Sequence, residues 1–169
     1  RGFMDFISRL VEQYDPDELV CCWDNDWRPA WRVELLPTYK AHRVVAERAT
    51  GPDIEEVPDP LEVQVPIILD VLEAFGICVR GADGYEADDV IGTLATGAAG
   101  PVDVVTGDRD LFQVVDDEAG VRVLYIARGV GNHERVDNAW MQAKYGVDAA
   151  QYADFATLRG DASDGLPGV

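Results

Sequence analysis

The sequence has few of the residues that build thiol-, zinc- and histidine-dependent sites. It contains three cysteines and two histidines, without a C-x-x-C pair or a Cys/His spacing that would suggest zinc. His42 and His133 are isolated, so nothing supports a Ser–His or Cys–His nucleophile. The cysteines at positions 21, 22 and 78 stand in apolar, strand-like runs, and we expect buried, reduced thiols. That usage fits a protein of the reducing cytoplasm.

The sequence also lacks a membrane segment and a basic surface. No apolar run approaches the roughly 18 residues of a membrane span, and the first residues do not follow the plan of a signal peptide. We therefore expect no membrane partner. The 14 Lys and Arg are outnumbered by 32 Asp and Glu, which gives a net charge of −18. This acidity argues against a generic nucleic-acid binder, which presents a basic surface, unless the carboxylates are clustered for a purpose.

The length suits one domain. A chain of 169 residues with 47% apolar residues and four Trp can fill a core, which argues against disorder. The ends predict a fragment of a longer protein, because residue 1 is Arg rather than Met and the chain stops in the turn-forming run Leu166-Pro167-Gly168-Val169.

Apolar periodicity predicts helices that alternate with short strands. The helical patterns cover Gly2–Tyr14, Val63–Phe75, Glu86–Thr96, Asp110–Val115, Asn138–Tyr145 and Tyr152–Arg159. The strand-like runs are Leu19–Trp23, Ile77–Val79, Val102–Val105 and Val121–Ile126. This alternation predicts an α/β fold with a mostly parallel central sheet flanked by helices.

Two stretches between these elements have no clear pattern. Asp24–Arg48 is rich in Trp and then basic, and Gly51–Pro60 is an acidic connector. Trp23, Trp27 and Trp31 are spaced by four, which fits either bases stacked in a single-strand channel or one packed helix face.

Carboxylates follow the ends of three consecutive predicted strands. In open α/β sheets, ligands bind beyond the carboxyl ends of the strands. The acids at these ends are Asp24 after the first strand, Glu86, Asp88 and Asp89 after the second, and Asp108 and Asp110 after the third. A further pair, Asp161 and Asp164, lies in the glycine-rich tail.

Each group of acids alone has an ordinary explanation, because acids favour the first turn of a helix and Asp caps helices and turns. Residues two apart in a helix point about 200° apart, so Glu86 and Asp88 can meet one ion only if Glu86 precedes the first regular turn. Together, so many carboxylates would repel one another and raise each other's pKa values. Hard divalent cations relieve that repulsion, and oxygen ligands suit Mg²⁺ or Mn²⁺. The sequence therefore predicts an acidic metal site, where two ions about 4 Å apart would clamp both oxygens of a phosphoryl displacement.

Four segments carry a resemblance to a known family. They are Tyr39-Lys40-Ala41-His42-Arg43, residues 84–92 (GYEADDVIG), residues 106–113 (TGDRDLFQ) and residues 160–169 (GDASDGLPGV). In this order and with these intervals they resemble the 5′ nucleases, which include the bacterial 5′–3′ exonucleases, the flap endonucleases and the nuclease domain of DNA polymerase I. The resemblance implies a PIN-like fold with a helical gateway or arch, two divalent metal ions, and hydrolysis of DNA or RNA phosphodiesters near a 5′ end or flap junction in replication and repair.

The resemblance also implies roles for individual residues. The first ion would be held by Asp24, Glu86, Asp88 and Asp108, and the second by Asp110, Asp161 and Asp164, directly or through water. Asp89 would support this cluster. Lys40 and Arg43 match the basic pair that contacts the scissile phosphate, and Arg32 matches a further basic position of the gateway. Without the resemblance, a basic pair three residues apart is typical of a solvated helix face.

The resemblance further implies a domain plan. Residues 1–159 would form the catalytic domain, with the gateway over residues 24–60, and residues 160–169 would begin a truncated helix–turn–helix element that grips the duplex. The family begins with a strand that ends in an Asp ligand, which we expect upstream of Arg1. The stretch Asp24–Arg32 is one residue longer than the family pattern, so Asp26 is an alternative to Asp24 as the ligand. Gly165 stands where many relatives have Asn.

The leading hypothesis is a monomeric, nucleoid-associated 5′ nuclease that uses Mg²⁺ or Mn²⁺ on DNA with a 5′ flap or a 5′ end, or on an RNA primer. The alternatives are a PIN-like ribonuclease and a non-catalytic, structure-specific nucleic-acid-binding module. We expect weak or no activity from the 169 residues alone. Once eight acids are assigned to the site, 24 acids remain against 14 bases, a charge of −10 elsewhere. The acidity thus becomes partial support for metal-dependent phosphodiester chemistry.

Overall fold

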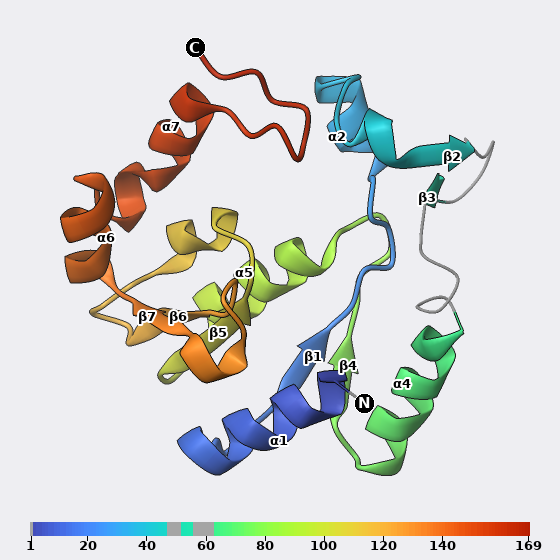
Figure 1. Ribbon diagram of the computed structural model, residues 1–169, viewed down its shortest axis with the longest axis vertical. Coiled ribbons are helices and arrows are strands. Elements are labelled where there is room, and N and C mark those ends of the chain that lie inside the picture. Colours follow the sequence, from blue (N-terminus) through green and yellow to red (C-terminus); the bar gives the residue numbers. More distant parts are fainter. Residues whose placement is uncertain (1, 47–51, 56–62) are drawn as a thin grey trace. The chain divides into compact units, whose positions relative to one another are not determined.

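The computed structural model describes residues 2–46, 52–55 and 63–169 (Figure 1). Parts of the predicted gateway and of the connector, including Arg48, lie outside the described residues. The chain forms two compact units, which we call the first and the second unit. The first is Arg1–Glu18 with Gly92–Leu158, and the second is Leu19–Ile91 with Arg159–Val169. Within the described part of the chain, no helix is long and apolar enough to cross a membrane.

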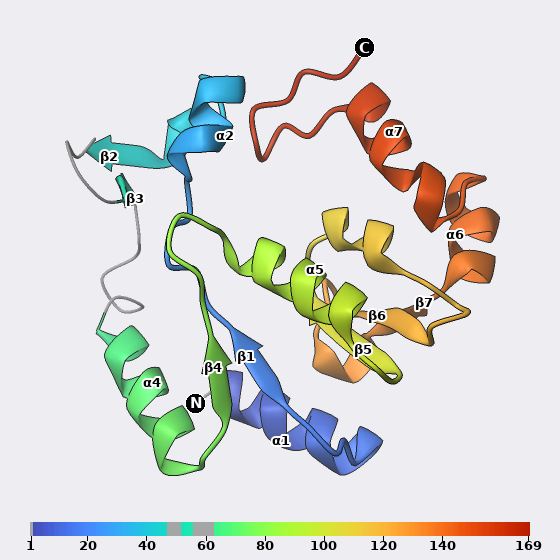
Figure 2. The ribbon, with the colours of Figure 1, turned by 180° about the vertical axis from the view of Figure 1, so that it is seen from behind.

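The first unit contains a three-stranded sheet. Its strands β5 (Val102–Thr106), β6 (Val121–Tyr125) and β7 (Glu134–Val136) lie in that order (Figures 1 and 2). β5 and β6 are parallel, whereas β7 returns antiparallel to β6. The helices of this unit are α1 (Gly2–Tyr14), the 3₁₀ helices η2 (Asp110–Val114) and η3 (Val130–Asn132), α6 (Asn138–Tyr145), most of α7 (Ala149–Arg159) and the end of α5 (Ala87–Gly97).

Aromatic side chains form the core of the first unit. Phe112 of η2 is fully buried, and its ring lies 5.1 to 5.5 Å from the rings of Tyr125, Trp140 and Tyr152. The contacts with Tyr125 and Trp140 are edge-to-face, the arrangement that aromatic quadrupoles favour. The core thus joins η2, a strand and two helices through one ring.

The second unit contains two small sheets. β1 (Val20–Cys22) and β4 (Cys78–Arg80) pair in parallel, and β2 (Val44–Ala46) and β3 (Ile54–Glu55) pair antiparallel. The helices among its described residues are α2 (Ala30–Leu35), the 3₁₀ helix η1 (Ala41–Arg43), α4 (Gln64–Ala74) and the start of α5. Gly76, at φ 69°, turns the chain from α4 into β4, which confirms the predicted helix stop.

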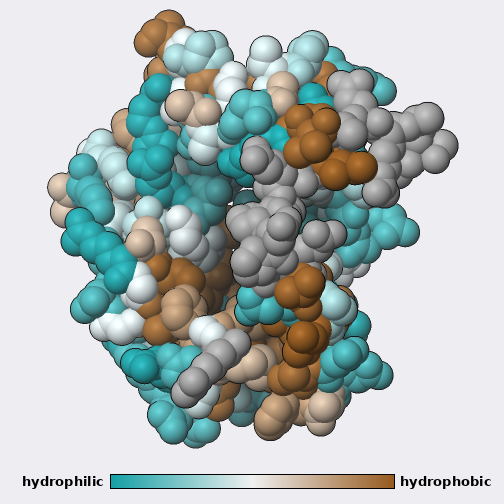
Figure 3. Space-filling model, turned by 45° about the vertical axis from the view of Figure 1, so that its right-hand side comes forward, coloured by the Kyte–Doolittle hydropathy of each residue, from teal (hydrophilic) through white to brown (hydrophobic). Residues whose placement is uncertain are grey.

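One side of α4 remains exposed. Val63, Ile67 and Phe75 are 65%, 58% and 74% exposed, and Figure 3 shows the apolar patch over this helix. Leu72 is fully buried. α4 is therefore attached to its unit through the side that carries Leu72.

The tail after α7 forms a closed loop. The backbones of Asp161 and Leu166 pair within it. Gly160 and Gly168 approach so closely that a Cβ on Gly160 would lie 2.4 Å from the Gly168 nitrogen. Both glycines also have positive φ, so their lack of a Cβ permits the closure. The role of this segment as the beginning of a helix–turn–helix element stays a prediction.

Most of the predicted elements are present. The helices at 2–14 and 138–145 have the predicted bounds, and α4 lies one residue inside the prediction at each end. α7 begins at Ala149, three residues before the prediction, and the predicted helix at 110–115 is a 3₁₀ helix. The two parallel strand pairs agree with the predicted parallel sheet.

Other predictions are corrected by the structure. The three Trp residues do not share a helix face, because Trp31 lies in α2, Trp23 follows β1 and Trp27 lies in the loop between them. The cysteines are free, as predicted, but each is half-buried rather than buried. The strands β2, β3 and β7 have two or three residues each, too few to show an alternating pattern. α2 follows Pro29 directly.

Candidate metal centre

Three of the predicted acids meet at the start of α5 in the second unit. Glu86 directly precedes the helix, and its carbonyl accepts a hydrogen bond from the Val90 amide at 3.3 Å. A carboxylate oxygen of Asp24 accepts the Ala87 amide at 2.6 Å, and one of Asp89 accepts the Glu86 amide at 3.0 Å. Amides at a helix start have no acceptor within the helix, and the helix dipole favours negative charge there. Glu86 therefore precedes the first regular turn, which is the condition for sharing an ion with Asp88.

Glu86 is buried and receives three donors. The Tyr39 hydroxyl donates to Oε1 at 2.6 Å, and Arg32 pairs with the same oxygen at 2.7 Å. The Lys40 ammonium donates to Oε2 at 2.5 Å. Because a buried carboxylate needs such partners, Lys40 and Arg32 here neutralise Glu86. The resemblance assigns Lys40 to the scissile phosphate and Arg32 to a further basic position of the gateway.

Arg32 also bridges two of the acids. Its guanidinium pairs with Asp89 at 2.8 Å as well as with Glu86. Although burial opposes the charged form of Arg32, these two carboxylates raise its pKa overall. Burial, together with the hydrogen bond to Glu86, raises the pKa of the Tyr39 hydroxyl, which therefore stays protonated and keeps donating.

The closed tail docks onto the residues around Lys40. The Lys40 amide donates to the Asp164 carbonyl at 3.2 Å, and Arg43 donates to the Ser163 carbonyl at 3.0 Å. A Cβ on Gly165 would lie 2.6 Å from the carbonyl oxygen of Thr38, so this contact requires glycine. The backbone of the tail thus lies against the backbone of the gateway.

The two tail acids have different surroundings. Burial raises the pKa of the Asp164 carboxyl, and the charges of Asp161 and Glu86 add to this rise while Lys40 and Arg43 oppose it. An oxygen of Asp161 accepts the amide and the hydroxyl of Ser163, at 2.8 and 2.5 Å, as in an ordinary Asp turn. Asp164 therefore belongs electrostatically to the group around Glu86 and Lys40.

Asp108 and Asp110 lie in the first unit, directly after β5. The Asp108 amide donates to the Thr106 hydroxyl at 2.9 Å, and the Asp108 carboxylate accepts the Asp110 amide at 2.8 Å. Both acids therefore stand beyond the carboxyl end of a parallel strand, as predicted. Their convergence with the acids of the second unit stays a prediction.

The acids fit a divalent cation by their chemistry, since carboxylate oxygens are hard ligands. Within the residues that the structure describes, no three His, Cys, Asp or Glu side chains are close enough together to hold one ion. In the second unit, the cationic side chains of Lys40 and Arg32 lie beside the Glu86 carboxylate. Asp88 lies near the end of β1, where its charge acts on the thiol of Cys22.

Sequence reasoning missed Tyr39 as a partner of Glu86. It also missed a buried ion pair whose arginine binds the Tyr39 carbonyl. Arg28 is 7% exposed, and its guanidinium pairs with Asp53 at 2.5 Å. The extra residue in the stretch Asp24–Arg32 is the signal in the sequence that could have drawn attention to Arg28.

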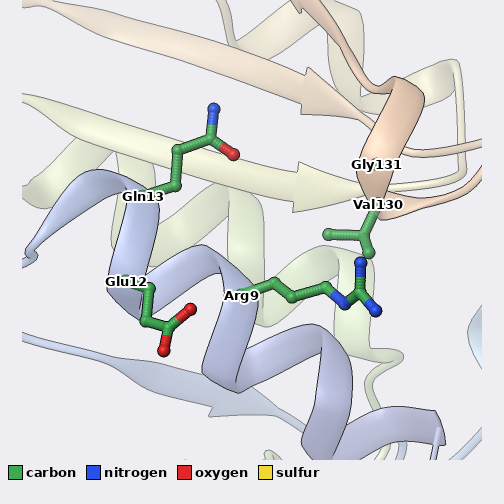
Figure 4. A pocket seen from close by; sticks show the side chains of 5 residues that line it. All are labelled: Arg9, Glu12, Gln13, Val130 and Gly131. Atoms are coloured by element: carbon green, nitrogen blue, oxygen red, sulfur yellow. The ribbon is translucent and has the colours of Figure 1, made fainter.

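A pocket of about 330 Å³ in the first unit has none of the predicted ligands in its lining. It is lined by Arg9, Glu12 and Gln13 of α1 and by Val130 and Gly131 of η3 (Figure 4). It is open to one side and offers no second carboxylate beside Glu12. It therefore does not contribute to the candidate metal centre.

Comparison with known proteins identifies the family. Residues 1–146 match the 5′–3′ exonuclease N-terminal resolvase-like domain. A 5′–3′ exonuclease of Streptomyces coelicolor is 64% identical over 169 residues, and one of Mycobacterium tuberculosis is 53% identical over 176. Both matches include all of this chain and 56% and 55% of those proteins, so the chain spans about half the length of these curated relatives.

The fold has a solved counterpart. The bacteriophage T5 D15 flap endonuclease, solved as a pseudo-enzyme–product complex with DNA and metal ions, matches with a TM-score of 0.67 at 19% identity. The match covers 99% of this chain and 60% of that one, and it confirms the α/β, PIN-like fold. Because the family model matches residues 1–146, the chain belongs to the 5′–3′ exonuclease N-terminal domain family.

Proposed function

We propose that this chain is the catalytic part of a divalent-metal-dependent 5′ nuclease that hydrolyses phosphodiester bonds of DNA. The observation that carries the proposal is that the carboxylates of Asp24 and Asp89 bind backbone amides at the start of α5, where Lys40 and Arg32 pair with Glu86. Carboxylates and cations in one place suit a metal and a phosphate together. The names of the relatives, 5′–3′ exonuclease and flap endonuclease, support the same activity.

The proposed metal ligands follow the family pattern. Asp24, Glu86, Asp88 and Asp108 would hold one ion, and Asp110, Asp161 and Asp164 a second, with Asp89 in support. Mg²⁺ or Mn²⁺ suits these oxygen ligands, and when bound it supplies an activated water. The contact of Asp24 with the start of α5 supports Asp24 over Asp26, whose carboxylate accepts the Arg28 amide.

Lys40, Arg43 and Arg32 are the proposed phosphate contacts. Lys40 and Arg32 stand beside Glu86, and Arg43 stands beside the tail, so all three lie in the second unit close to proposed ligands. Their positive charge would stabilise the charge that develops on the phosphate during cleavage. The proposal also includes association of the protein with the nucleoid and a monomeric state.

The test is cleavage of 5′-flap DNA, in Mg²⁺ or Mn²⁺, by the longest gene product that contains this chain. We expect Lys40→Ala and Asp108→Asn each to lower the rate by about 100-fold or more. The matched controls are Lys144→Ala and Asp103→Asn, because both residues form exposed ion pairs outside the site. Normal rates in the first two variants would contradict the assignment, and a preference for unstructured RNA over flap DNA would favour a ribonuclease.

A further inference from the structure

Arg28 is a buried cation whose guanidinium binds the backbone of the gateway. Its Nε donates to the Tyr39 carbonyl at 2.7 Å, and one terminal nitrogen donates to the Pro37 carbonyl at 3.4 Å. The other terminal nitrogen pairs with the Asp53 carboxylate at 2.5 Å. The side chains of Arg28 and Asp53 are 5% and 16% exposed. A planar guanidinium can make these three contacts at once, whereas the ammonium of lysine is a point charge.

Asp53 is held from two sides. The indole nitrogen of Trp27 donates to the Asp53 carbonyl at 2.8 Å, while Arg28 holds its carboxylate. The Arg28 amide is in turn fixed by a 3.2 Å hydrogen bond to the Asp26 carboxylate. Trp27 and Arg28, two consecutive residues of the lengthened stretch Asp24–Arg32, therefore both bind Asp53, which lies 25 positions after Arg28.

The contacts of Arg28 end next to Lys40, whose backbone is strained. Lys40 has φ 46° and ψ 21°, a left-handed conformation that residues with a Cβ adopt at a cost in free energy. Arg28 holds the carbonyl just before Lys40, and the Asp164 carbonyl accepts the Lys40 amide. The Lys40 ammonium then reaches Glu86 and, at 3.4 Å, the carbonyl of Trp27 beside Arg28.

We propose that Arg28, braced by Asp53, is a positioning residue that holds Lys40 in its left-handed conformation and so directs the Lys40 ammonium into the candidate site. Arg28 acts through Lys40, because each of the three guanidinium nitrogens already donates, to Tyr39, Pro37 or Asp53. This inference rests on the proposed function, in which Lys40 contacts the phosphate.

The experiment measures kcat and KM on 5′-flap DNA, together with DNA affinity in EDTA and circular dichroism, for the longest gene product containing this chain. We expect Arg28→Met to lower kcat by about 10- to 100-fold with KM and DNA affinity nearly unchanged. Arg28→Lys should restore part of kcat, because the charge remains while the fork is lost. The matched control is Arg122→Met, which removes the arginine of an exposed Arg–Asp pair of the same 2.5 Å length.

The decisive measurement is a double-mutant cycle. If Arg28 acts through Lys40, Arg28→Met adds almost no loss of kcat in a Lys40→Ala background. Additive losses, or a normal kcat for Arg28→Met while Lys40→Ala is impaired, would overturn the inference and leave the proposed function standing. A normal kcat for Lys40→Ala would instead overturn the role of Lys40 and the inference with it. Should Arg28→Met fail to fold by circular dichroism, Asp53→Asn and Arg28→Lys enter the same cycle and decide it.

Discussion

Single side chains from distant parts of the sequence determine the charge at the candidate site. Glu86 draws donors from Arg32, Tyr39 and Lys40, which precede it by 46 to 54 positions. Because these donors compensate the buried carboxylate, removing one of them leaves a charge without its partner. Three donors of the second unit therefore converge on one acid.

Two thiols near this site provide a readout of local charge. Burial raises the pKa of Cys21 and Cys22, and for Cys22 the neighbouring Cys21 and the carboxylate of Asp88 raise it further. A raised pKa leaves less thiolate, the reactive form, at a given pH. We expect iodoacetamide to modify both thiols more slowly in the folded than in the urea-unfolded protein at about pH 8, with the folded rate still rising as the pH increases towards the raised pKa.

The dependence on Asp88 separates the two thiols. Asp88→Asn should lower the pKa of Cys22 and speed its modification more than that of Cys21, as peptide mass spectrometry would show. Asp70→Asn, in α4, is the control. Equal acceleration of both thiols would mean that Asp88 does not act on Cys22.

Among the secondary-structure elements, α6 has both its ends determined by local sequence. Asp137 precedes it in extended backbone, and its carboxylate accepts the Trp140 amide at 2.7 Å. Gly146 ends it in the left-handed conformation at φ 72°. Such signals explain why the bounds of α6 are predictable, whereas the short strands β2 and β3 depend on contacts from elsewhere in the chain.

The cap of α6 can be tested by stability. Asp137→Ala should lower the free energy of unfolding by about 0.5–2 kcal/mol, because the Trp140 amide loses its acceptor. Asp137→Ser keeps an acceptor and should recover most of the loss in urea titrations followed by circular dichroism. An unchanged midpoint for Asp137→Ala would show that solvent satisfies this amide equally well.

Over the whole molecule, the sequence predicts helices, strand ends and other local features, but it does not predict the contacts between residues far apart in the chain. Helical periodicity predicts α1, α4 and α6, and strand ends predict where Asp24 and Asp108 stand, because both patterns arise from neighbours in the chain. The pairing of Arg28 with Asp53 and of Lys40 with Glu86 depends on how the gateway folds back. No local pattern encodes such contacts, since the partners are 25 or more positions apart.

The net charge of −18 predicts that divalent cations stabilise the intact chain. A divalent cation that binds the folded acids should raise the melting temperature, with a gain of about 2.7 kcal/mol when its concentration is 100 times the Kd. The comparison is Mg²⁺ or Mn²⁺ against NaCl at matched ionic strength, followed by calorimetry, and Asp108→Asn should reduce the gain. An equal rise in NaCl would show general screening in place of binding.

The closed tail has a mechanical consequence. Because the backbones at Gly160 and Gly168 lie against each other, the residues between them form a closed ring rather than a free end. Asp161 and Asp164 are both carried on that ring, and its far side leans on Thr38 through Gly165. We expect a side chain at any of the three glycines to clash with the facing backbone and so to displace the ring that carries both carboxylates.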